Sequence, residues 1–409
     1  MSPSPPARLS AAFLRLAWSH LAAQCSEQMA LAAAAIIAVL MFGAGGEQTG
    51  LLQTAQTLPF LIFSLPAGVL ADRLSRRALM VAGEAARAGS LAAILALIAS
   101  GRLTLTLLGA LGFLGAAGTV VYSVTAPAAV PLLAPRELLT LANRWLELAR
   151  SCAFAAGPAI GGALVGWWGA PTAYVVAMAL SLFAISMLAR LPDMRGQWGA
   201  PLRHPVRDLI EGARFVMGHP LLRPLLVVAI LFNISWFVFQ AVYAPYAIGH
   251  LGLDAAGVGA TLGAYGAGMV AGALGAPALA RRLTFGMTIV VGPFSAFLAS
   301  LLMAATIAAP SGLIAGLSFF LFGAGPVVWV ITTTTLRQAV TPNAMLGRVS
   351  AIFVGATYGA RPIGAAIGAA VSGGFSVEAC LIISAIGFLA QLAAILGSAP
   401  PRLKALPTG

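Results

Sequence analysis

About twelve runs of apolar residues, each long enough to cross a bilayer, dominate this sequence and are separated by short polar breaks. A spanning helix needs about 20 apolar residues. Only 8% of the 409 residues are charged and 60% are hydrophobic, whereas a soluble domain carries about 25% charged residues. We therefore predict an all-α polytopic membrane protein. The predicted spans are 13–42, 49–71, 78–100, 104–126, 144–167, 170–190, 222–248, 257–280, 285–308, 312–336, 348–372 and 377–397.

The basic residues indicate how these spans are oriented. The net charge is +12, and every basic residue except Lys404 is Arg. They collect in alternate breaks, such as 73–77 and 281–282, while the opposite side carries only Arg102. Cytoplasmic loops carry the Lys/Arg excess, so both termini are predicted to be cytoplasmic. No basic patch with interleaved aromatic residues occurs, and we expect no nucleic-acid partner.

One long break divides the chain nearly in half. Its segment 205–218 alternates charged and apolar residues with the spacing of an amphipathic helix at the membrane surface. We predict an N-terminal six-helix bundle over 1–190, a cytoplasmic linker over 191–221 and a C-terminal six-helix bundle over 222–409. The breaks after the second and eighth spans resemble each other, as do the segments around the fifth and eleventh spans, at offsets of about 204 to 209 residues, as expected for a repeat.

The break after the second span reads Gly68-Val-Leu-Ala-Asp-Arg-Leu-Ser-Arg-Arg77. It resembles the signature between helices 2 and 3 of the major facilitator superfamily, which implies twelve helices arranged as two bundles. In that family the Asp and Arg residues form a charge cluster that clamps the two halves on the cytoplasmic side. The residues that match are Gly68, Asp72, Arg73, Arg76 and Arg77, while Ser75 stands where the family has Gly. The alternative is an ordinary positively charged cytoplasmic loop.

The fifth span contains Ala153-Phe-Ala-Ala-Gly-Pro-Ala-Ile-Gly-Gly162. It resembles the antiporter motif of drug exporters, whose small residues allow close helix packing and whose Pro kinks the helix. The residues that match are Gly157, Pro158, Gly161 and Gly162; generic small-residue packing is the alternative. The fourth span lacks the Arg of a standard drug–proton exporter, and segment 341–349 is similar to the exporter branch that includes the enterobactin exporter family.

Charges inside a span are costly, about 2.5–3.5 kcal/mol near a helix centre. Glu27 lies near the middle of the first span, on a polar face with His20, and is a candidate proton-coupling carboxylate. The alternative is a structural carboxylate permanently paired with Arg or Gln. Arg361 lies near the centre of the eleventh span and is a candidate partner of Glu27 or of an anionic substrate group.

Two further carboxylate–guanidinium pairs, Glu84 with Arg87 and Glu147 with Arg150, have the i, i+3 spacing of local ion pairs. A role linked to the Asp72 cluster is the alternative. Amide and aromatic side chains on several spans suit an amphipathic ligand, although packing against neighbouring helices explains them as well. These substrate-cavity candidates are Gln24, Gln28, Gln53, Gln56, Asn233, Trp236, Gln240 and Tyr243.

No P-loop, nucleophile elbow or metal-ligand cluster occurs in the sequence, so we expect no enzyme activity, cofactor or metal. We predict a secondary active transporter that exports a small amphipathic, drug-like or siderophore-like molecule by proton antiport. The expected partners are the bilayer of a bacterial-type inner membrane, the substrate and protons, and the chain is expected to be a monomer. An importer or uniporter of the same fold, and a non-transporting membrane sensor or assembly protein, are the alternatives.

Overall fold

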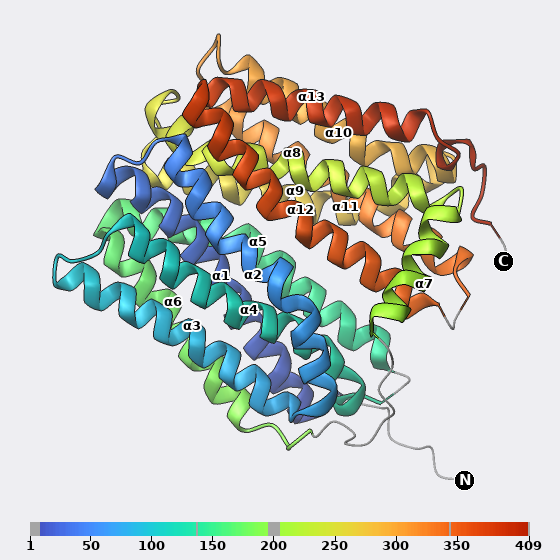
Figure 1. Ribbon diagram of the computed structural model, residues 1–409, viewed down its shortest axis with the longest axis horizontal. Helices are drawn as coiled ribbons and strands as arrows, with labels where there is room; N and C mark the ends of the chain where they lie inside the picture. The colour runs from blue at the N-terminus through green and yellow to red at the C-terminus, as the bar shows by residue number, and fades with distance from the viewer. Residues whose placement is uncertain (1–8, 136–137, 195–204, 343–344, 408–409) are drawn as a thin grey trace. The chain divides into compact units, whose positions relative to one another are not determined.

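The computed structural model describes residues 9–135, 138–194, 205–342 and 345–407, without the side chains of Leu65, Val69, Asp72, Thr140, Pro205, Val206 and Asp208 (Figure 1). Within these ranges the chain is helical and contains no strand. The helices are α1 (Ala11–Phe42), α2 (Gly46–Arg73), α3 (Arg76–Ala99), α4 (Leu105–Leu133), α5 (Leu139–Trp168), α6 (Ala170–Ala189), α7 (Pro205–Gly218), α8 (Leu222–Gly249), α9 (Ala255–Arg282), α10 (Phe285–Ala305), α11 (Gly312–Val340), α12 (Leu346–Gly374), α13 (Val377–Leu396) and the short 3-10 helix η2 (Pro400–Arg402).

Among the described residues, ten helices are long and apolar enough to cross a membrane. The all-helical membrane fold predicted from the sequence is therefore confirmed. The helices α2 and α12, of 28 and 29 residues, are not in this set, so the predicted count of twelve spans stays a prediction. The helix predicted over 205–218 is present as α7 with the same bounds.

The chain forms two compact units. Unit 1 comprises residues 1–34 and 59–200, and unit 2 comprises residues 35–58 and 201–409. The first two helices therefore contribute to both units, which the sequence did not suggest. The domain limits at residues 190 and 222 stay a prediction.

In unit 1, α3 packs against α4 and α6, and α5 packs against α6. In unit 2, α9 and α10 pack against α11, while α12 and α13 pack against α8. Small residues bring the backbones together: a Cβ on Gly83 of α3 would lie 2.6 Å from the Gly118 carbonyl of α4. Such close approach is how helices associate in lipid, where apolar burial supplies no driving force.

The helices follow each other in the second half of the chain as they do in the first. Gly46 and Ala255 begin α2 and α9, 209 positions apart, and Leu139 and Leu346 begin α5 and α12, 207 positions apart. The N-terminal caps repeat too, because the hydroxyls of Ser75 and Thr284, 209 positions apart, each accept a hydrogen bond at the start of α3 and α10.

The segment after the last helix of each half folds back in the same way. The Arg76 amide at the start of α3 donates to the Met194 carbonyl at 2.9 Å. Similarly, the Gly286 amide at the start of α10 donates to the Leu403 carbonyl at 2.8 Å. Both bonds satisfy helix N-terminal amides that have no partner within their own helix.

The amphipathic helix α7 docks on the start of α12 within unit 2. Glu211 of α7 accepts from Arg348 of α12 at 2.6 Å, and Gly212 allows the helix to approach the Arg348 backbone. The next residue after α7, His219, accepts with Nδ1 from the Leu221 amide at 3.2 Å. Burial lowers the pKa of His219, which favours the neutral ring that this acceptor role requires.

Two glycines of α5 allow this helix to pack closely against α1. A Cβ on Gly157 would lie 2.6 Å from Cβ of Gln28, and one on Gly161 would lie 3.1 Å from the Met29 carbonyl. The predicted small-residue motif is therefore a packing surface for the middle of α1.

Unit 2 contains the same contact. The glycines 207 positions later, Gly364 and Gly368 of α12, face α8: their Cβ atoms would lie 3.0 Å from Phe237 Cβ and 2.9 Å from the Val238 carbonyl. Phe237 and Val238 lie 209 positions after the α1 residues that face α5. The contact therefore aligns α1 with α8 residue by residue.

We expect Gly157→Val and Gly364→Val each to lower the free energy of unfolding by about 1–3 kcal/mol, because the new side chain overpacks a helix contact. Thermal unfolding of the purified protein in detergent measures the effect. Gly89→Val in α3 is the matched control, because Gly89 is exposed and a Cβ there would meet no atom within 4 Å. Equal stability of all three variants would contradict the close packing.

Candidate functional site

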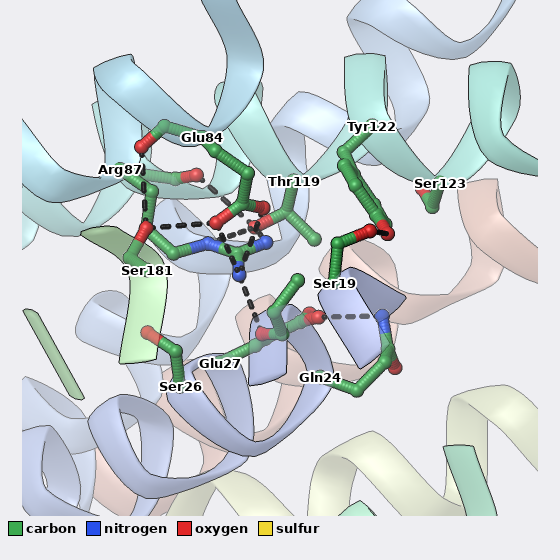
Figure 2. A network of polar contacts seen from close by, with 12 residues as sticks. Ser19, Gln24, Ser26, Glu27, Glu84, Arg87, Thr119, Tyr122, Ser123 and Ser181 are labelled. Atoms are coloured by element: carbon green, nitrogen blue, oxygen red, sulfur yellow. Dashed lines mark hydrogen bonds and ion pairs between the residues drawn. The ribbon is translucent and has the colours of Figure 1, made fainter. Parts of the chain in front are cut away.

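The middle of α1 presents polar side chains to the interior of unit 1. His20, Gln24 and Gln28 are buried, and Glu27 is half-buried. The amide Nε2 of Gln24 lies 3.5 Å from Glu27 Oε2 (Figure 2). The polar face predicted for this span therefore lies within the protein, where a charged group is far less costly than in lipid.

The α4 side of this face is aromatic and polar. The His20 ring stacks on the Tyr122 ring with centroids 5.8 Å apart. The Tyr122 hydroxyl lies 3.4 Å from the Ser19 hydroxyl. Tyr122 is fully buried, so these partners satisfy its polar end inside an apolar helix bundle.

A fully buried ion pair lies next to this face. Glu84 is 0% exposed and Arg87 is 3% exposed, and their charged atoms are 3.2 Å apart. The Ser181 hydroxyl of α6 donates to Glu84 Oε2 at 2.7 Å. The i, i+3 pair predicted from the sequence is therefore present, but it is part of a larger network.

The guanidinium group of Arg87 joins three helices. Its Nε and one terminal nitrogen donate to Thr119 Oγ1 of α4 at 3.2 and 2.7 Å. Its other terminal nitrogen donates to the Ala23 carbonyl of α1 at 2.5 Å. Figure 2 shows the guanidinium between the Glu84 carboxylate and the turn of α1 that bears Glu27. Because the donors of Arg form a rigid fork, these bonds fix the group in one orientation.

Two more contacts hold the same part of α1. The Ser26 hydroxyl donates to the Ala177 carbonyl of α6 at 2.7 Å. On the α5 side, Gly157 lies against Gln28, with Pro158, Gly161 and Gly162 also buried. The α1 turn that contains Glu27 is therefore in contact with α3, α5 and α6.

The predicted gate motif lies at the junction of α2 and α3. Gly68 is half-buried and Arg73 is exposed, whereas Arg76 and Arg77 are half-buried. The Arg77 guanidinium donates to the Leu191 carbonyl at 3.1 Å. The Ser75 hydroxyl donates to Asp193, a partner that the sequence did not suggest. The side chain of Asp72 is outside the described residues, so its role in a charge cluster stays a prediction.

In unit 2, Arg361 is held by aromatic rings. Its guanidinium lies 4.4 Å from the Tyr358 ring centroid and 5.6 Å from that of Phe237. Such cation–π contacts stabilise an arginine inside a bundle. Arg361 belongs to unit 2 and Glu27 to unit 1, so their pairing stays a prediction.

The predicted cavity residues of unit 2 divide into two groups. The rings of Trp236 and Tyr243 are buried in an aromatic cluster, where Trp236 lies 5.0 Å from Phe322 and Tyr243 lies 4.6 Å from Phe319. The amide-bearing candidates Asn233, Gln240 and Gln53 are half-buried, and Gln56 is buried. Asn233 donates to the Ala229 carbonyl of its own helix at 2.9 Å. A role for all of them in substrate binding stays a prediction.

Sequence reasoning missed Thr119 and Ser181 as partners of the ion pair. Both are uncharged and lie 32 and 97 positions from their partners, so no local spacing marks them. A comparison of the two halves could have singled out the ion pair itself, since the second half has no charges at the corresponding positions.

The architecture is that of the major facilitator superfamily. The crystal structure of a D-xylose-proton symporter matches with a TM-score of 0.72, covering 96% of this chain and 99% of that chain at 14% identity. This similarity shows the fold.

A model of the family described as "Transmembrane secretion effector" matches residues 4–407. The chain belongs to this family of major facilitator transporters. The resemblance predicted from the Gly68–Arg77 motif is thereby confirmed.

Two curated relatives are similar over large parts of the chain. The enterobactin exporter EntS of Escherichia coli O1:K1 / APEC is 28% identical over 258 residues, which are 63% of this chain and 60% of that protein. The chain thus matches about 60% of the length of the enterobactin exporters. The multidrug efflux pump Tap of Mycolicibacterium fortuitum is 27% identical over 392 residues, 90% of each chain.

The buried ion pair predicts an asymmetry between single and double substitution. Glu84→Leu leaves Arg87 charged and without its carboxylate, so we expect a loss of about 3–5 kcal/mol in the free energy of unfolding. Glu84→Leu combined with Arg87→Met removes both charges and is expected to leave stability within about 1 kcal/mol of the wild type, or above it. The hydroxyl of Thr119 keeps its bond to the Gly115 carbonyl in the double variant.

Chemical denaturation in mixed micelles measures the free energy of unfolding of both variants. A double variant as unstable as Glu84→Leu would contradict the view that the charges are dispensable for folding.

Proposed function

We propose that this transporter exports a small amphipathic molecule, drug-like or siderophore-like, by antiport with protons, and that Glu27 is the carboxylate that carries the proton. The observation on which the proposal rests is the position of Glu27, half-buried in the middle of an apolar helix and surrounded by buried polar side chains.

Export is supported by the relatives. The multidrug efflux pump Tap, which matches over 90% of both chains, and the enterobactin exporter EntS are both exporters by name. The name of the first gives drugs as its substrates, and the name of the second gives the siderophore enterobactin. The amide and aromatic side chains of the predicted cavity residues support an amphipathic substrate.

The glycines of α5 add nothing to the direction of transport. Gly157 and Gly161 have counterparts in Gly364 and Gly368, which make the same contact in unit 2. A contact that occurs in both halves is explained by helix packing alone.

Proton coupling is supported by the chemistry of Glu27. A carboxylate inside a bundle can be neutral or ionised depending on its surroundings, and a change of surroundings releases or takes up a proton. Its neighbour Gln24 can hydrogen-bond either form. No P-loop for ATP hydrolysis is present in the sequence, so an ion gradient is the proposed source of energy.

We further propose that the protein acts as a monomer in a bacterial inner membrane with both termini in the cytoplasm. The alternation of Arg-rich and Arg-poor loops supports this orientation.

Transport into proteoliposomes tests the proposal, with ethidium and enterobactin as probes of the two substrate classes. We expect an imposed pH gradient to drive at least one probe, and Glu27→Gln to reduce gradient-driven transport to the protein-free background. Exchange of the probe across the membrane without a gradient should persist, because Gln preserves the shape of the site.

Glu378→Gln is the control, since Glu378 is a half-buried carboxylate in the first turn of α13, where it lies 3.8 Å from His250 of the same unit. Undiminished gradient-driven transport by Glu27→Gln would contradict the role of this residue. Transport of neither probe would contradict the substrate class.

A further inference from the structure

The repeat provides an internal comparison for the buried ion pair of unit 1. The positions 209 residues after Glu84 and Arg87 are Pro293 and Ala296, both buried in α10. A helix in this place therefore folds without any charge.

The partners of the ion pair are replaced as well. Ser181 corresponds to Phe388 in α13, 207 positions later, and Glu27 corresponds to Trp236 in α8, 209 positions later. The rings of Trp236 and Phe388 both pack against Phe322, at 5.0 and 5.1 Å. The centre of unit 2 is thus aromatic where that of unit 1 is ionic.

The framework around these centres is conserved between the units. In unit 1 the Ser26 hydroxyl donates to the Ala177 carbonyl, and in unit 2 the Ser384 hydroxyl donates to the Ser235 carbonyl. Ser26 corresponds to Ser235, and Ala177 corresponds to Ser384. The same two positions are therefore bonded in both units, with donor and acceptor exchanged. The ionic centre is therefore a difference in side chains within a shared helix packing.

Replacing a buried ion pair by well-packed apolar residues is commonly neutral or stabilising. Unit 2 shows that the fold accommodates such residues. The charges of Glu84 and Arg87 are thus not required by the helix packing, and they occur in the unit that carries Glu27.

The contact between Arg87 and α1 indicates the role of the ion pair. In an α-helix the carbonyl of residue 23 pairs with the amide of residue 27. Arg87 donates to this same Ala23 carbonyl at 2.5 Å, so it binds the turn that carries Glu27. Glu84 and Thr119 in turn orient Arg87.

We propose that Arg87 is a positioning residue, which Glu84 and Thr119 hold against the Ala23 carbonyl so that it sets the place and the electrostatic surroundings of Glu27. This inference rests on the proposed role of Glu27 in proton coupling. Arg87 fixes the turn that carries Glu27 through the Ala23 carbonyl, and Glu84 balances its charge at 3.2 Å, so the pair orders this part of α1 without adding net charge.

Other titratable groups on the surrounding helices remain unchanged in the experiment. Among the described residues of these helices they are Arg15, His20 and Cys25 on α1, Arg76 and Arg77 on α3, Tyr122 on α4, Arg144, Glu147, Arg150 and Cys152 on α5, and Tyr174 on α6. A shift in pH dependence between variants is therefore caused by the substituted residues.

The test compares wild type with Glu84→Leu/Arg87→Met in proteoliposomes, using whichever of ethidium and enterobactin the wild type transports. We expect the gradient-driven rate to fall about tenfold and the midpoint of its pH profile to move by about one unit, since tenfold in proton affinity corresponds to one pH unit. Probe exchange without a gradient should keep its KM within about twofold, because the pair touches no proposed substrate group.

Thr119→Val and Thr119→Ser give a second, milder comparison that does not depend on the folding of the double variant. Val removes the hydroxyl that orients Arg87, and Ser retains it. We expect Thr119→Val to shift the midpoint as well and Thr119→Ser to match the wild type.

A wild-type rate and midpoint in the double variant, or equal behaviour of Thr119→Val and Thr119→Ser, would overturn the positioning role. Glu27→Gln separates the two proposals. If Glu27→Gln abolishes gradient-driven transport while these variants behave as wild type, only the positioning role fails. If Glu27→Gln transports normally, the proposed function fails first.

Discussion

Helices in a bilayer gain little by hiding apolar surface from lipid, so close contact between their backbones must hold them together. This constraint explains why glycines occupy the α3–α4, α5–α1 and α12–α8 contacts. The cost of an unpaired polar group inside such a protein, several kcal/mol, explains why Glu84 and Arg87 are joined with Thr119 and Ser181 in one network. The position of every proposed functional side chain follows from these contacts.

The two units share their helix contacts but differ in the side chains at their centres. Each contains a paired-glycine contact, a serine bond between corresponding helices and a fold-back segment that caps a helix start. Their centres differ, with Glu84 and Arg87 in one and Trp236 among aromatic rings in the other. The difference places the buried carboxylate–guanidinium pair in unit 1, which also carries Glu27.

Much of the fold could be predicted from the sequence, because hydropathy, loop charge and the Gly68–Arg77 motif are local signals. The helix over 205–218 is present with its predicted bounds for the same reason. The bonds of Arg87 could not be predicted, since Thr119 and Ala23 lie 32 and 64 positions away. The packing of Trp236 against Phe322 could not be predicted either, because the two rings lie on different helices, and the role of Trp236 in ligand binding stays a prediction.

If Glu27 carries the proton that is exchanged for the substrate, binding of the substrate should release this proton. Proton release by the purified protein in weakly buffered detergent solution, followed with a pH indicator as ethidium or enterobactin is added, is the measurement that decides it. We expect release by the wild type that saturates with the bound probe and is absent in Glu27→Gln. Release of the same size by Glu27→Gln would contradict it.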